Sequence, residues 1–231
     1  MRVKIIACEV MKEELRAIPA AAHNDIEFIS MGLHLYPEKL GRELQCILDK
    51  LTGYDRVVLA FGLCGGAAKN LRAGDFILTI PRVHDCIALL LGSQEQFEQK
   101  RREEKGTLYL SGGWFKGERS FTSEFERVRQ KYGEKKANRV YRRMYDGYRR
   151  VLFIHTRHPQ EEECLARSKQ ISDFLSLAHQ TIEGNLTYIE RIAAGPWDES
   201  DFINIPPRGM IDESAFFRHF SIPFPGAGSK K

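Results

Sequence analysis

Three of the five cysteines in the sequence lie shortly after apolar segments that are typical of buried β-strands. Cys8 follows VKIIA, Cys64 follows RVVLAFG, and Cys86 follows DFILTIP after a short polar stretch. Because the carboxyl ends of parallel strands meet at one edge of a sheet, we expect these thiols to lie close together. With His84 they would form a set of three sulfurs and one imidazole, which suits tetrahedral Zn²⁺. The sequence therefore predicts a zinc site with Cys8, Cys64, His84 and Cys86 as ligands.

Other occupants of this ligand set remain open. Three thiolates that leave one coordination position free also suit an iron–sulfur cluster. His84 and Cys86 are two positions apart, so both side chains face one point only where the chain is extended. If a helix begins by Val83, only one of the two points into the site. The spacing of the ligands does not match a zinc-finger pattern.

Acidic and basic side chains at the same strand ends could support catalysis without a metal. Glu9 is adjacent to Cys8, and His84 with Asp85 could form a general base and its orienting carboxylate. Cys8 and Cys64 could also act as acid and base on a small substrate, as in the cofactor-independent amino-acid racemases. Asp85 and Glu9 are the predicted catalytic residues. Further polar residues just past predicted strands are His34, His155 and Arg157.

Glycines next to these strand ends could help to bind a substrate. In FGLCGG, a strand enters a glycine-rich turn before a helix, which exposes backbone N–H groups to an anion and lowers a thiol pKa. The alternative is that the glycines only let the helix pack close to the sheet. The segment matches neither GxGxxG nor a P-loop, so no dinucleotide or ATP site is predicted. The predicted substrate-binding residues are Gly65, Gly66, Arg82, Gly113 and Trp114, the last as an apolar lid or as an anchor for the next segment.

The elements that position these groups alternate between strands and helices. Amphipathic stretches with helical spacing, such as 38–51 and 161–179, separate most of the strand-like runs. Apolar strands joined by helical crossovers predict an α/β fold, a Rossmann-like doubly wound and mostly parallel sheet. The strand-like runs are 3–7, 26–30, 56–62, 75–81, 107–112, 150–156 and 186–191.

Two segments depart from this alternation within what we expect to be a single domain, 1–231. A helical insertion, 115–149, follows the fifth strand. The tail, 195–231, is rich in Pro and Gly and should wrap over the body as loop. A short helix in DESAFFRHF should be capped by Asp212 or Ser214, and the final GAGSKK should be disordered.

Composition indicates a cytoplasmic globular protein. Hydrophobic residues make up 42% and charged residues 29% of the 231 residues, which is ordinary for a folded soluble chain. The first apolar run is interrupted by Glu9, so we expect no signal peptide, and no run is long enough to cross a membrane. Five cysteines, widely spaced and odd in number, indicate reduced thiols rather than a disulfide framework. Cys46 and Cys164 lie in helical patterns and are expected in the core.

Positive charge is concentrated in one segment. Residues 100–150 hold 16 Lys and Arg against 7 Asp and Glu, whereas the rest of the chain holds 19 against 24. The spacing favours a solvated helical face; the alternative is a non-catalytic binding or assembly surface. Nucleic acid is not expected as a partner, because no nucleic-acid motif accompanies the charge.

Four motifs together resemble the DUF1638 family, uncharacterised α/β proteins of anaerobic bacteria and methanogenic archaea: KIIACEV, FGLCGG, IPRVHDCIALLLGS and TLYLSGGW. The similarity continues through the basic segment and into GPWDESDFINIPPRG. The resemblance implies that the family's motif positions here are Cys8, Cys64, His84, Asp85, Cys86 and Gly113.

The resemblance also implies a setting, as an accessory protein of corrinoid-dependent methyl metabolism. A zinc–thiolate site of a methyltransferase-type enzyme would fit it, because a metal holds sulfur as thiolate at neutral pH. The chain has no corrinoid-binding motif, so a separate corrinoid protein would be the partner. A small-molecule substrate and a second copy of the chain complete the partners considered.

Overall fold

The strands form two sheets in the computed structural model, which describes residues 1–116 and 120–217. In the first sheet, of order β2-β1-β3-β4-β8, the first four strands are parallel and β8 runs antiparallel to β4. The second sheet, β5-β6-β7, is parallel throughout. The chain is therefore a mixed α/β protein. The strands are β1 (Val3–Cys8), β2 (Asp25–Ile29), β3 (Arg56–Ala60), β4 (Ile77–Pro81), β5 (Thr107–Leu110), β6 (Arg150–His155), β7 (Ala178–Glu183) and β8 (Phe202–Ile205).

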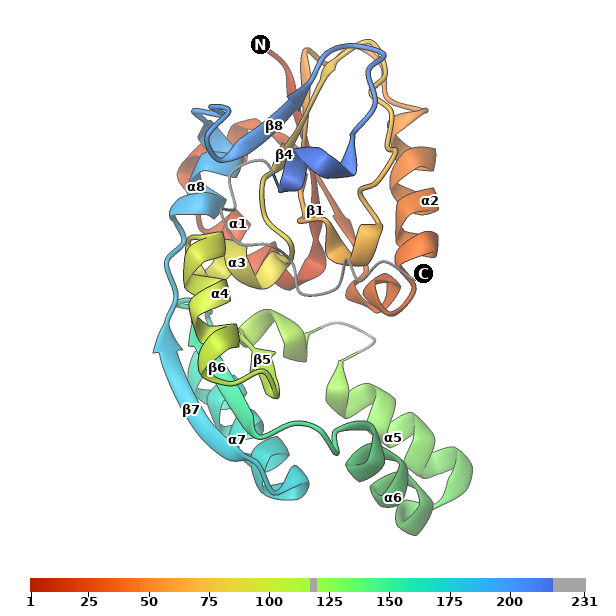
Figure 1. Ribbon diagram of the computed structural model, residues 1–231, viewed down its shortest axis with the longest axis vertical. Coiled ribbons are helices and arrows are strands. Elements are labelled where there is room, and N and C mark those ends of the chain that lie inside the picture. The colour runs from red at the N-terminus through yellow and green to blue at the C-terminus, as the bar shows by residue number, and fades with distance from the viewer. Residues whose placement is uncertain (117–119, 218–231) are drawn as a thin grey trace, which may run out of the picture.

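Helices cover both faces of the first sheet (Figure 1). On one side lies α2 (Pro37–Leu48), which buries Leu40, Leu44 and Leu48 at helical spacing. On the other side lie α1 (Lys12–Arg16), α3 (Cys86–Leu91) and α8 (Thr187–Ala194). Because both faces are covered, all six residues of β1 are buried, as a central parallel strand requires.

The second sheet has a smaller core of its own. The residues of this core are Leu110, Phe115, Val151, Phe153, Cys164 and Ile171, supplied by β5, β6, the segment after β5 and α7 (Glu161–Leu175). The segment from 115 to 149 contains a helix pair, α5 (Phe121–Tyr132) and α6 (Glu134–Met144), at the far end of the molecule (Figure 1). Phe121 and Phe125 both pack edge-on against Tyr141, at centroid distances of 5.1 and 5.0 Å.

The remaining helical segments are α4 (Gln94–Glu103) and several 3₁₀ turns, which connect the elements named above. α4 follows α3 and leads into β5. The 3₁₀ turns are η1 (Glu9–Met11), η2 (Pro19–His23), η3 (Met31–Leu35), η4 (Cys64–Gly66), η5 (Gly112–Phe115) and η6 (Glu213–Phe216). In the tail, the Asp212 side chain accepts a hydrogen bond from the Ser214 N–H at 2.9 Å and caps η6, as the sequence predicts. The predicted disorder of GAGSKK falls outside the described residues.

Several sequence predictions are wrong about the fold, among them the tail, which was predicted as loop but contributes β8. The predicted strand 186–191 is helical, because Tyr188, Ile189, Ile192 and Ala193 bury one face of α8. The predicted helix 161–179 ends at Leu175, and the chain continues into β7, whose largely exposed residues carry no clear apolar alternation. The strands also divide between two sheets rather than forming one.

Cys46 is exposed rather than in the core, whereas Cys164 is buried as expected. Within the described ranges, no helix combines the length and the apolar character that crossing a membrane requires.

Candidate functional site

Three cysteines meet at the carboxyl edge of the first sheet. Cys8 is the last residue of β1, Cys64 opens η4 after β3, and Cys86 is the first residue of α3 after β4. Their exposed fractions are 0%, 8% and 5%, and none is in a disulfide. The Cys8 and Cys86 thiols are hydrogen-bonded to each other. The strand register therefore places three reduced thiols close together in one buried region.

The imidazole that contacts these thiols belongs to His34, in η3 after β2. The ring interacts with the thiols of Cys8 and Cys64 and stacks on Phe61, with centroids 5.9 Å apart and planes inclined by 18°. Both ring nitrogens are shielded from solvent, and among the described residues neither has a hydrogen-bond partner. We call Cys8, His34, Cys64 and Cys86 the thiol cluster.

His84 lies on the other side of the loop and faces α4. Its Nδ1 is 3.7 Å from Glu98 Oε1, and its ring contacts Phe217 at a centroid distance of 5.2 Å. The helix begins at Cys86, and it is Cys86 that contacts Cys8. The role of His84 as a metal ligand stays a prediction.

Charge within the thiol cluster is set by its members acting on one another. Burial alone would raise the pKa of Cys8, but the neighbouring Cys86 thiol and His34 ring lower that pKa to about 6. Burial would lower the pKa of His34, but Cys64 and Cys8 raise it to about 11. The hydrogen bond to Cys8 and burial raise the pKa of Cys86, and burial raises that of Cys64. Without a metal, these shifts favour a Cys8 thiolate beside a His34 imidazolium at neutral pH.

The loop that carries Cys64 is held against the loop that carries Cys86. The Leu63 and Cys64 N–H groups donate to the Val83 and His84 carbonyls at 2.9 and 3.0 Å. A Cβ on Gly62 would lie 2.7 Å from the Asp85 nitrogen, so only glycine permits this approach. Cys64 itself has φ +46°, a conformation that costs a non-glycine residue about 1 kcal/mol or more. The backbone thus fixes where this sulfur lies.

Several predicted residues have structural roles. The Asp85 carboxylate caps α3 by accepting the Ile87 N–H at 2.8 Å. The Arg82 guanidinium is buried and donates to the carbonyls of Ala215, Glu199 and Phe202, which ties the tail to the first sheet. Trp114 is partly buried and packs against both apolar cores. A Cβ placed on Gly65 would lie 3.0 Å from the Pro37 ring, whereas nothing lies within 4 Å of a Cβ placed on Gly66.

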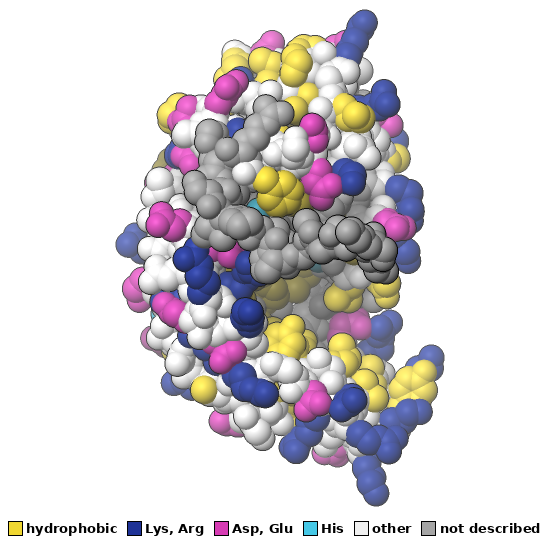
Figure 2. Space-filling model, viewed as in Figure 1, with side chains coloured by type: hydrophobic (Ala, Val, Ile, Leu, Met, Phe, Trp, Pro, Cys, Tyr) yellow, Lys and Arg dark blue, Asp and Glu magenta, His cyan; other side chains and the backbone are white. Residues whose placement is uncertain are grey.

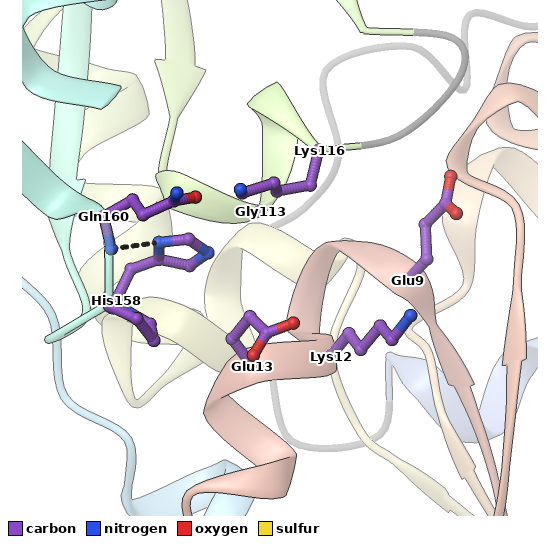
Figure 3. A pocket seen from close by; sticks show the side chains of 8 residues that line it. Glu9, Lys12, Glu13, Gly113, Lys116, His158 and Gln160 are labelled. Carbon is purple, nitrogen blue, oxygen red and sulfur yellow. Dashed lines mark hydrogen bonds between the residues drawn. The ribbon is translucent and has the colours of Figure 1, made fainter. Parts of the chain in front are cut away.

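Glu9 and Gly113 line a separate cleft of about 340 Å³ (Figure 3). Glu9 Oε1 accepts a hydrogen bond from the Met31 N–H at 2.8 Å. A Cβ on Gly113 would overlap the Val10 carbonyl, so η1 and η5 touch at this wall. Sequence reasoning did not select His158 and Lys116, which also line this cleft; His158 follows β6 by a few residues, the signal that selected the cysteines.

No cation site is preformed in the described part of the chain. Across residues 1–116 and 120–217, no group of three or more His, Cys, Asp or Glu side chains is arranged to hold a metal ion. The thiol cluster has a donor set that suits Zn²⁺, and its orphaned His34 nitrogens fit such a ligand. Binding would require the sulfurs to turn from one another toward a common point.

The fold and this cluster define a class of protein, a mixed α/β protein with thiols and an imidazole at the carboxyl edge of a mostly parallel sheet. A family model described as "Protein of unknown function (DUF1638)" matches residues 28–193. The chain belongs to this family, as its motifs indicate. His34, Cys64 and Cys86 fall within the matched range, and Cys8 precedes it. No curated protein and no solved structure matches the chain.

Proposed function

We propose that the protein binds a thiophilic metal ion, Zn²⁺ first of all, through Cys8, His34, Cys64 and Cys86. The observation that carries this proposal is the His34 ring, whose two buried nitrogens lack a full hydrogen bond while the ring lies against two of the three thiols. A buried polar atom without a partner costs about 1–3 kcal/mol, so such an atom among soft sulfur donors points to a ligand.

The strand order supports this location for a ligand. β2 lies on one side of β1, whereas β3 and β4 lie on the other, so the strand order reverses between β1 and β3. In doubly wound sheets this switch point is where ligands bind. Cys8 and Cys64 follow these two strands. We also propose that this sheet has a Rossmann-like, doubly wound architecture.

Protons must leave the thiol cluster when a cation binds. The lowered pKa of Cys8 favours its thiolate, whereas Cys64 and Cys86 must each lose a proton and His34 must become neutral. A zinc-bound thiolate could then serve as a methyl acceptor. The family resemblance supports that finer proposal, with a corrinoid protein as methyl donor; an iron–sulfur cluster is the alternative occupant.

A metal-free thiol enzyme is the second candidate, and the Cys8–His34 ion pair favours it. A thiolate beside an imidazolium is the activated state of many nucleophilic cysteines. The racemase-type version has less support, because Cys8 and Cys64 contact the same imidazole and are both buried. A substrate that sits between these two thiols would have to displace the His34 ring.

Metal analysis of the full chain, purified without oxygen, tests the proposal. We expect about one equivalent of zinc or iron in the wild type and less than about a tenth in Cys64→Ser, Cys86→Ser and His34→Ala. The matched controls are His84→Ala and Cys164→Ser, which should keep their metal. Wild-type protein that stays metal-free after incubation with Zn²⁺ would refute the proposal. Metal loss in His84→Ala but not in His34→Ala would assign the imidazole ligand to His84.

A further inference from the structure

The cleft of about 340 Å³ lies between two walls that come from different parts of the chain (Figure 3). One wall is the segment Glu9–Glu13, directly after β1. The other comprises Gly113 and Lys116, next to η5, and His158–Gln160, before α7. The cleft shares no side chain with the thiol cluster.

His158 offers the cleft a buried donor without a partner. Its side chain is nearly inaccessible, at 5% exposure, and its Nδ1 accepts a hydrogen bond from the Gln160 N–H at 3.1 Å. Burial lowers the pKa of His158, so the ring is neutral at physiological pH and its proton resides on Nε2. Within the described residues, Nε2 has no hydrogen-bond partner. The ring packs directly on Gly112, where a Cβ would overlap it.

Two opposite charges face this histidine from the two walls. Glu13 and Lys116 both line the cleft and both act electrostatically on the His158 ring. Their side chains form no hydrogen bond and no ion pair in the part of the chain that the structure describes. Figure 3 shows the Lys116 and Gln160 side chains extending toward each other beside the imidazole, with Glu13 across from them. An acid and a base that share a small cleft without pairing leave room for a ligand between them.

We propose that this cleft binds a small zwitterion that carries both a carboxylate and an amino group, the class of the free α-amino acids. The ligand carboxylate accepts hydrogen bonds from His158 Nε2 and from the Lys116 ammonium. The ligand ammonium pairs with the Glu13 carboxylate. A simple anion would satisfy the wall that carries His158 and Lys116 and leave Glu13 facing a negative charge, so both charges of the ligand are needed. The volume suits a molecule of this size.

Thermal unfolding of the full chain with added probes tests this inference. Each common amino acid is compared with its matched 2-oxo acid, its matched amine and inorganic phosphate. We expect at least one amino acid to raise the unfolding midpoint by about 2–4 °C, and its matched single-charge compounds to raise it by much less. No response to any amino acid overturns the inference. An equal response to phosphate or to the oxo acid overturns it in favour of a simple anion site.

Variants separate the cleft from other causes of stabilisation. Calorimetry with the responding amino acid should show affinity at least about tenfold weaker in Glu13→Gln and in Lys116→Met. Both side chains are at least partly exposed, so these variants should fold. Glu162→Gln and Lys169→Met on α7 are matched exposed controls and should bind normally. Equal losses in the controls, or none in the cleft variants, refute the proposed contacts. Cys64→Ser should bind the amino acid normally, so this result does not depend on the metal proposal.

Discussion

His34 and His158 lie in two different regions of the molecule. Both rings have nitrogen shielded from solvent, but their pKa values shift in opposite directions. Each has ring nitrogen shielded from solvent without a full hydrogen bond, and burial disfavours the charged ring in both. In the thiol cluster, the Cys8 and Cys64 thiols overcome burial and raise the pKa of His34 to about 11. In the cleft, burial prevails and the pKa of His158 is lowered. Neighbouring groups, rather than depth, decide which imidazole carries a charge.

This comparison suggests different ligands for the two regions. The thiol cluster offers a thiolate and thiols that can become anions, so it suits a cation. The cleft offers a neutral N–H donor with a lysine on one wall and a glutamate on the other, so it suits a molecule with two charges. Both regions follow the carboxyl end of β1, through Cys8 and through Glu9 to Glu13.

The largest expected effect comes from the contact that forms one wall of the cleft. Gly113→Ala should lower the free energy of unfolding by about 3 kcal/mol or more, because the new methyl group overlaps the Val10 carbonyl and backbone must move. Urea denaturation measures the change. Gly147→Ala is the matched control, since nothing lies within 4 Å of a Cβ there. Similar stability of the two variants would contradict the close approach of η1 and η5.

The second prediction separates the two histidines by their effect on a thiolate. In metal-free protein, ultraviolet absorbance should report one thiolate that forms as the pH rises through about 6, the lowered pKa of Cys8. His34→Gln should shift that transition to higher pH, because the stabilising imidazolium is lost. His158→Gln should leave it unchanged. A transition near 6 that survives His34→Gln would contradict the ion pair.

A smaller effect is expected at Glu14, the buried neighbour of Glu13. Glu14 Oε1 accepts a hydrogen bond from the Thr156 hydroxyl at 2.6 Å, Oε2 has no partner among the described residues, and burial raises the pKa of the carboxyl. A raised folded-state pKa means that the stabilising contribution is complete below the ordinary value of 4.5 and is lost as the pH rises through the raised value.

Replacement by a neutral side chain should remove this loss. Glu14→Gln is therefore expected to stabilise the protein by about 1 kcal/mol at pH 7 to 8 and to have little effect near pH 4. Chemical denaturation at both pH values measures the difference. Glu162→Gln, at an exposed position, should show no such pH dependence. Destabilisation by Glu14→Gln at the higher pH would contradict a raised pKa.

The smallest effect on stability is expected on the basic helix pair. Lys and Arg side chains gather around α5 and α6 in Figure 2, and Arg142 and Arg143 are exposed. Arg142→Glu with Arg143→Glu should change the free energy of unfolding by less than about 1 kcal/mol. If these helices bind a partner, the same variant should abolish a strongly salt-dependent association. A large loss of stability would show that the helix pair supports the fold.

The sequence predicted the thiols of the cluster better than its histidine. Cys8, Cys64 and Cys86 could be grouped because apolar runs mark strand ends and parallel strands share an edge. His34 was passed over in favour of His84, which is closer to Cys86 in sequence. His34 reaches the thiols because η3 turns the chain after β2. Residue spacing does not predict that turn.

The sequence also did not predict which strands pair with one another. Apolar runs identified β1 through β6, but nothing local says that β5 and β6 leave the first sheet. β7 was read as the end of a helix because AHQTIE is largely exposed. β8 was read as loop because FINI stands among Pro, Gly and acidic residues. The cleft is a product of these pairings, so sequence reasoning did not group its His158 with Lys116, although His158 follows β6 by only a few residues.

The antiparallel pairing of β8 with β4 also sets an order of events during synthesis. β1 through β4 all emerge from the ribosome within the first 81 residues, whereas β8 begins only at Phe202. Until then the outer edge of β4 offers unpaired N–H and C=O groups, which invites pairing with another chain. Rapid collapse of the first four strands during that interval would limit such pairing. A chain truncated before β8 should aggregate while still carrying the complete thiol cluster.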